Sequence, residues 1–127
     1  MIFYNHIWKK NQYLLVNYES VFEKIAWTLS FRGYAVNNWY AAESSTLVAS
    51  ALSLKNTQKR NYYLDFYLNK DTVVDGCGQL GLPSTVKKWF TPDGHWKEPG
   101  GYHNYPVSKL IEAAMMLENN GYQIFNK

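Results

Sequence analysis

The feature that most restricts the fold of this chain is a local pattern that occurs twice: a serine, apolar residues at helical spacing, and then a Gly-Tyr pair. In the first copy, Ser20 is followed three residues later by Glu23, the capping-box arrangement that begins many helices. The pattern predicts helices over 20–32 and 108–120, each ended by a glycine that takes positive φ without strain. These glycines are Gly33 and Gly121.

Strands are expected after both glycines and in two further places. Segments 34–36 and 122–125 follow the glycines, and a strand over 13–16 is expected within the first 18 residues. Residues 61–68 alternate as a half-buried strand does. The side chains expected on its core face are Tyr62, Leu64, Phe66 and Leu68, and those expected on the opposite face are Tyr63, Asp65 and Tyr67.

Three remaining segments complete the predicted organisation. Residues 42–55 carry apolar side chains at helical spacing, 75–81 form a glycine-rich turn, and 84–90 form a short helix at most. The alternation of helices and strands predicts a single α+β domain over residues 1–127. We expect a mixed helix/strand sandwich with about three helices packed on a small sheet.

Composition narrows the functional classes. The net charge of +3 and the pI near 8.9 are mildly basic, well short of the clustered excess of a dedicated nucleic-acid protein. Cys77 is the only cysteine, so the chain forms no internal disulfide. Neither a signal-peptide pattern nor an apolar run long enough for a membrane span occurs. We therefore expect a cytoplasmic protein with no membrane association.

The segment 89–106 predicts a recognition surface. Large aromatic rings alternate there with prolines and glycines, which excludes a regular amphipathic element and favours a loop. The chain has 5 Trp, 11 Tyr and 6 Phe, more rings than the core needs, so we expect some at the surface. The expected partner-binding residues are Trp89, Phe90, His95, Trp96, Tyr102, His103 and Tyr105, with Trp96 and Tyr102 at least partly exposed at the centre.

An alternative interpretation makes the same loop catalytic. His95 and His103 could divide proton donation and acceptance, with Lys97 offsetting phosphate charge, as in a small nuclease-like hydrolase. The simpler interpretation is that both histidines are polar loop residues. Their spacing, with Asp93 and Glu98 nearby, matches no established zinc motif, so no metal site and no cofactor are predicted.

Two further interpretations complete the functional analysis. Lysines among the rings of this loop would suit a single-stranded nucleic-acid-binding module, although the net charge of the loop segment is small. Cys77 lies in a glycine turn without a known nucleophile motif around it. The favoured hypothesis is a small intracellular protein-binding module, for example an immunity protein or a phage-encoded inhibitor, with a protein partner. The sequence leaves the oligomeric state open.

Overall fold

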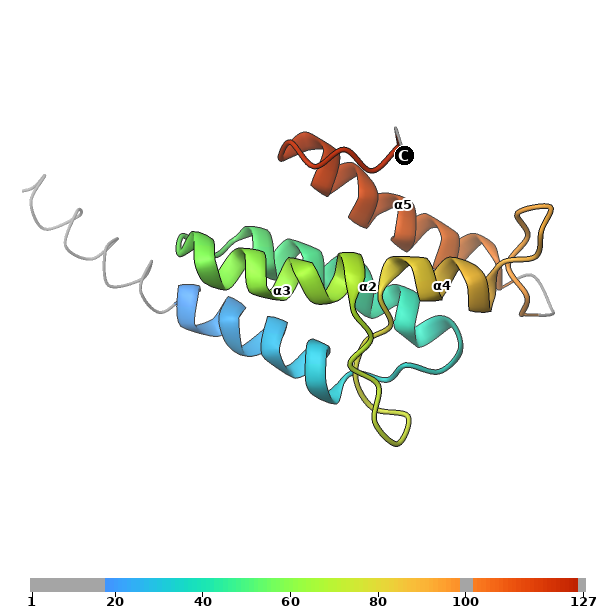
Figure 1. The fold of residues 1–127 in the computed structure, drawn as a ribbon, viewed down its shortest axis with the longest axis horizontal. Helices are drawn as coiled ribbons and strands as arrows, with labels where there is room; N and C mark the ends of the chain where they lie inside the picture. Colours follow the sequence, from blue (N-terminus) through green and yellow to red (C-terminus); the bar gives the residue numbers. More distant parts are fainter. Residues whose placement is uncertain (1–17, 99–101, 126–127) are drawn as a thin grey trace, which may run out of the picture.

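The computed structural model describes residues 18–98 and 102–125, and this part of the chain is all-helical (Figure 1). A first helix covers residues 18–32 and is called the 18–32 helix below. The other helices are α2 (Asn37–Leu52), α3 (Thr57–Asn69), α4 (Leu82–Trp89) and α5 (Asn104–Asn119). Among these residues β-structure is limited to isolated bridges. The predicted α+β sandwich is therefore wrong, because no sheet forms for helices to pack on.

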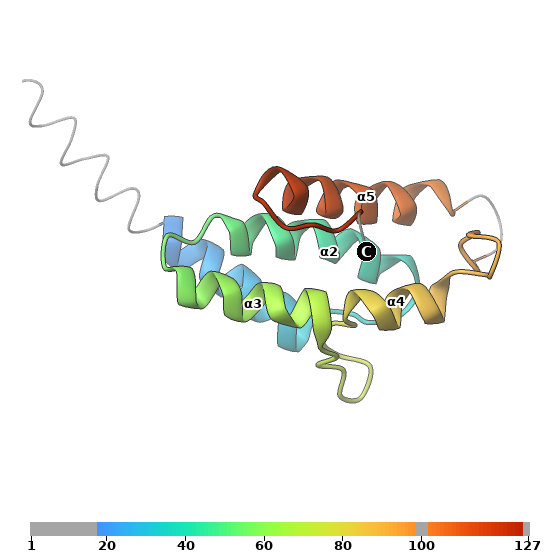
Figure 2. The ribbon, with the colours of Figure 1, turned by 45° about the horizontal axis from the view of Figure 1, so that its top comes forward.

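Helix α2 occupies the centre of the molecule. It packs against α5 and α3, and both ribbon views place it between α5 on one side and α3 with the 18–32 helix on the other (Figures 1 and 2). Its small side chains, such as Ala41, Ser44 and Ala51, are buried and let neighbouring helices approach closely. A helix that is apolar or small on most sides suits such an enclosed position.

The predicted strand over 61–68 is part of α3. Tyr63, Leu64 and Tyr67 are buried at helical spacing, whereas Phe66 is half-buried and Tyr62 is exposed, so the predicted core face is also wrong. Tyr62 and Phe66 form an edge-to-face pair, and Phe66 makes a second one with Phe31 of the 18–32 helix. Because aromatic side chains lie on both the buried and the exposed side of α3, its sequence does not show a clear helical period.

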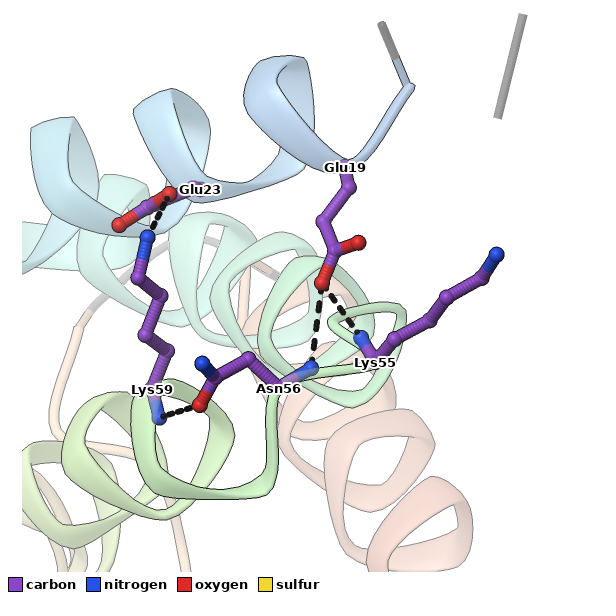
Figure 3. Close-up of polar contacts among 5 residues, drawn as sticks. All are labelled: Glu19, Glu23, Lys55, Asn56 and Lys59. Atoms are coloured by element: carbon purple, nitrogen blue, oxygen red, sulfur yellow. Dashed lines mark hydrogen bonds and ion pairs between the residues drawn. The ribbon is translucent and has the colours of Figure 1, made fainter. Parts of the chain in front are cut away.

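A network of polar contacts joins the 18–32 helix to the turn before α3 (Figure 3). Glu19 Oε1 accepts from the backbone N–H groups of Lys55 (2.9 Å) and Asn56 (3.1 Å). The Asn56 side chain accepts from the Lys59 N–H at 3.0 Å, and Lys59 Nζ lies 2.7 Å from Glu23 Oε2. Asn56 is therefore the N-cap of α3, and Glu19 satisfies two further donors at this helix start.

Both predicted serine caps lie inside helices. Residue 18, the first one described, is already helical, so Ser20 is not the N-cap of this helix. Helix α5 begins at Asn104 rather than after Ser108. Proline is tolerated in a first turn, where its missing N–H would have no helical partner, and Pro106 occupies that position in α5. The predicted helices themselves are present, as are those near 42–55 and 84–90.

The two glycines after these helices behave differently. Gly121 has the predicted positive φ of 87°. Gly33 also follows a helix, but it is not among the residues with positive φ, so that prediction is wrong. Neither following strand forms: Tyr34 makes one bridge with Cys77, and residues 122–125 are irregular. The predicted strand over 13–16 lies outside the described residues.

The core consists of two clusters, and α2 contributes to both. The first cluster lies among the 18–32 helix, α2, α3 and α5 and contains Ala26, Leu47, Val48, Ala51, Leu54, Tyr63, Leu64, Tyr67, Ala113 and Leu117. The second lies at the other end of α2 and contains Ala35, Tyr40, Ala41, Leu80, Trp96 and Leu110. The end of α4, through Trp89 and Phe90, and Val107 of α5 pack against this second cluster.

A tight hairpin over 72–79 projects from the helical body between α3 and α4 (Figure 1). Asp75 and Gly76 have φ values of 52° and 79°, the paired positive φ of a type I′ turn, for which Asp-Gly is a preferred sequence. Thr72 N–H donates to the Gln79 carbonyl at 2.8 Å and closes the base of the hairpin. The predicted glycine turn is thus present, with Cys77 exposed on its returning arm.

Candidate functional site

The aromatic residues of segment 89–106 divide into two groups. Trp89, Phe90 and Trp96 turn inward onto the second core cluster. The indole rings of Trp89 and Trp96 stack with centroids 5.3 Å apart, and Phe90 meets Trp96 edge-on at 5.4 Å. Trp96 is only 5% exposed, so the prediction of an exposed Trp96 at the centre of a binding patch is wrong. Trp96 is buried, whereas Trp89 and Phe90 are half-buried, and the packing of the three rings anchors the loop to the core.

A short turn between Phe90 and Trp96 explains this inward direction. Residues Phe90 and Trp96 form an antiparallel bridge, and Lys97 N–H donates to the Trp89 carbonyl at 2.8 Å. Gly94 closes the turn with a positive φ of 85°. Because the chain reverses directly, the residues on either side of the turn face the core together, whereas the turn itself stays in solvent.

The residues of the catalytic alternative make their described contacts with other groups. His95 is exposed in the turn, with its Nε2 atom 3.5 Å from an oxygen of Asp93. His103 is exposed and stands at the start of α5. Across residues 18–98 and 102–125, no hydrogen bond or ion pair joins His95, His103 and Lys97. Lys97 Nζ instead donates to the carbonyl oxygens of Lys88 (2.9 Å) and Lys87 (3.4 Å) at the end of α4.

The second aromatic group remains at the surface. Tyr102 is 60% exposed and Tyr105 is 50% exposed, and both line a cavity of about 650 Å³. Asn38, Trp39 and Glu98 complete the lining that the structure describes, and Trp39 is itself 62% exposed. We call this cavity the Tyr102–Tyr105 pocket. The prediction of an exposed Tyr102 is confirmed.

Glu98 fixes the end of the loop to the start of α2. Its Oε1 atom accepts from the backbone N–H of Asn38 at 3.2 Å, and its Oε2 atom accepts from the indole Nε1–H of Trp96 at 3.1 Å. A carboxylate at a helix N-terminus is favoured by the free N–H groups and by the helix dipole. Glu98 therefore connects the buried aromatic group to the exposed pocket.

Sequence reasoning missed the contribution of α2 to this pocket. Asn38 and Trp39 lie in the first turn of α2, about sixty positions before Glu98, and the predicted helix began only at residue 42. The Asn37-Asn38 pair before a run of helix-forming residues was the available signal for an earlier helix start. No local pattern indicated that this turn meets the 89–106 segment.

Other candidate chemistry in the described residues is sparse. No group of three or more His, Cys, Asp or Glu side chains there is arranged to hold a metal ion. The Cys77 thiol is exposed, and within the described chain no histidine contacts it. A nucleophilic role, which the sequence does not favour, would need such a base beside the thiol.

The described chain is therefore all-helical, with an aromatic pocket where α2, α5 and the preceding loop meet. None of the helices among the described residues is long and apolar enough to cross a bilayer. Comparison with protein-family models, with curated proteins and with solved structures gives no match.

Proposed function

We propose that this protein is a binding module without catalysis, which docks a protein partner at the Tyr102–Tyr105 pocket. An inhibitor that blocks a site on its partner, as an immunity protein does, is the form that we favour. The observation that carries the proposal is that Trp39, Tyr102 and Tyr105 are each at least half exposed around one cavity. Binding energy at protein interfaces concentrates in a few such aromatic anchors.

The pocket is supported by ordered structure on two sides. Trp39 belongs to α2 and Tyr105 to the first turn of α5, which also contains Pro106, a buried residue with a fixed φ. Glu98 ties the loop to α2 through the Asn38 N–H. Anchors held in this way lose little conformational entropy on binding, which favours affinity.

The same contacts favour binding over the hydrolytic and nucleic-acid alternatives. Hydrolysis of the proposed kind requires two histidines that act on one bond, and His95 and His103 have no shared contact in the described residues. Lys97 directs its ammonium group to two backbone carbonyls of α4. The charged side chain that lines the described pocket is Glu98, whose carboxylate would repel a phosphate backbone.

The proposal is tested by comparing three variants as bait in a lysate of the native host. Tyr102→Ala and Tyr105→Ala remove exposed rings from the pocket, whereas Tyr62→Ala removes a ring of similar exposure, 51%, from α3. We expect one protein to be retained by the unmodified chain and by Tyr62→Ala, but not by the two pocket variants. With that protein purified, Tyr102→Ala should weaken binding by about 2 kcal/mol or more.

Two results would overturn the proposal. The first is a partner that binds the unmodified chain and both pocket variants with equal affinity. The second is hydrolysis of RNA or DNA by the purified protein that is abolished in His95→Ala or His103→Ala. Because Tyr102 and Tyr105 are exposed, the melting temperature of each variant should stay close to that of the unmodified protein, which serves as the control for folding.

A further inference from the structure

We propose that the Tyr102–Tyr105 pocket receives an arginine side chain of the protein partner. This inference rests on the proposed function and specifies the chemistry of the bound group. It is carried by the combination of exposed aromatic rings with one carboxylate, Glu98, in the same cavity. A guanidinium group stacks on aromatic faces and pairs with carboxylates, so both components of the pocket attract the same ligand.

The charge of the described lining has one sign. Glu98 is the one carboxylate among the five described lining residues, and the ammonium groups of Lys97 and Lys88 are directed elsewhere. Lys97 Nζ donates to carbonyls at the end of α4, and Lys88 Nζ lies over the Trp89 ring, 5.1 Å from its centroid. Among the described residues, no lysine, arginine or histidine forms an ion pair with Glu98.

The hydrogen bonds of Glu98 leave acceptor capacity for a ligand. Each carboxylate oxygen has two lone pairs, and each accepts one described hydrogen bond, from Asn38 at Oε1 and from Trp96 at Oε2. The Asn38 and Trp96 donors hold the carboxylate in one orientation. A guanidinium presents two parallel N–H groups that match such a carboxylate, whereas a lysine ammonium offers no planar fork or stacking face.

The two donors to Glu98 provide direct reporters for the experiment. The ¹⁵N-labelled full chain would be titrated with N-acetyl-arginine amide and, separately, with N-acetyl-citrulline amide, its neutral isostere. We expect arginine to shift the Asn38 backbone N–H and the Trp96 indole N–H signals in a saturable manner. Its Kd should be lower than that of citrulline by about tenfold or more, because citrulline lacks the charge. The preference should weaken as salt is raised.

Variants separate the rings from the carboxylate. Tyr102→Leu removes an exposed ring and leaves Glu98 in place, so arginine binding should weaken while the Asn38 and Trp96 signals keep their unliganded positions. Glu98→Gln should abolish the preference for arginine over citrulline. Its amide nitrogen would face one of the two donors, so the spectrum of that variant is checked for folding first. Glu112→Gln, an exposed glutamate on α5, is the matched control and should bind as the unmodified chain does.

The outcomes distinguish this inference from the proposed function. Equal shifts with arginine and citrulline, or unsaturable shifts with both, would overturn the arginine assignment. If partner binding is still lost in Tyr102→Ala, the docking function would stand with a different ligand group. Saturable arginine binding that Tyr102→Leu leaves unchanged would also overturn the assignment to this pocket. Arginine binding at the pocket without any partner that depends on Tyr102 would overturn the docking function instead.

Discussion

Tyr40 and Tyr67 are both completely buried, but their hydroxyl groups have different surroundings. The Tyr40 hydroxyl donates to the Leu80 carbonyl at 2.9 Å and also contacts the Thr85 hydroxyl. The Tyr67 hydroxyl has no hydrogen-bond partner in the described residues. Burial raises the pKa of both phenols, so each stays protonated at neutral pH.

This difference predicts opposite results for one substitution made at two positions. Tyr40→Phe leaves the Leu80 carbonyl without its described donor, whereas the Thr85 hydroxyl keeps its bond to the Gly81 carbonyl, so the protein should be destabilised by about 1–3 kcal/mol. Tyr67→Phe removes a buried group that has no described partner, so the free energy of unfolding should stay unchanged or rise. Urea unfolding of the two variants provides the comparison. A larger loss for Tyr67→Phe than for Tyr40→Phe would contradict the prediction.

Glu43 predicts a pH dependence at the residue scale. Burial raises the pKa of its carboxyl group above the ordinary 4.5, against the opposing effect of the Tyr34 N–H that donates to it at 2.7 Å. The folded chain therefore takes up this proton at a higher pH than the unfolded chain. The contribution of Glu43 to stability accordingly falls as pH rises from 4.5 through the folded pKa.

Glu43→Gln removes this ionisation and keeps an oxygen that accepts from Tyr34. We expect the stability of the unmodified protein, relative to this variant, to increase as pH is lowered from 7 to about 4.5. Urea unfolding of both proteins at the two pH values measures the change, and the subtraction cancels the other titrating groups. A difference that stays constant with pH would show that Glu43 keeps its ordinary pKa in the folded chain.

At the scale of elements, the connection between α4 and α5 depends on Trp96. Its ring stacks on Trp89, meets Phe90 edge-on and donates to Glu98. Trp96→Ala should therefore destabilise the protein by about 3–5 kcal/mol. The same variant should weaken arginine binding in its folded fraction, because Glu98 loses a positioning donor. An unchanged melting temperature would contradict the assignment of Trp96 to the core.

Elements differ in how well the sequence predicts them. The 18–32 helix and α5 were found because their apolar residues recur at helical spacing. Helix α3 was missed because a run of tyrosine, leucine and phenylalanine satisfies a strand alternation as well as a helical period. The N-cap Asn56 and the polar residues after it would have favoured a helix. Local patterns also misplaced the start of α5, where Pro106 was the better signal.

At the scale of the whole molecule, α2 joins the two core clusters. Leu47, Val48 and Ala51 belong to the first cluster, and Tyr40 and Ala41 belong to the second. One continuous helix that contributes to both should make them unfold together. Thermal unfolding followed by far-UV circular dichroism and by tryptophan fluorescence should therefore give one shared midpoint. Separate midpoints would show that the Trp96 cluster unfolds independently.

The candidate site could be predicted only in part, because it is assembled at this scale. Aromatic content correctly indicated an exposed ring at Tyr102, but it gave no means to separate that ring from the buried Trp96 and the half-buried Trp89 and Phe90. That separation depends on the turn that pairs Phe90 with Trp96 and on the Glu98 contact with α2. Contacts between distant segments of this kind leave no local pattern in the sequence.

The hairpin over 72–79 has a consequence for engineering this protein. Its base is closed by the Thr72–Gln79 bond, and the Gly78 N–H donates to the Gly33 carbonyl at 2.7 Å. Asp75 and Gly76 at its tip are exposed and lie outside both core clusters. A guest peptide or a small domain grafted between them would enter and leave at neighbouring points without separating any helix pair. The hairpin is thus a natural insertion point through which a reporter could be carried while the Tyr102–Tyr105 pocket stays unobstructed.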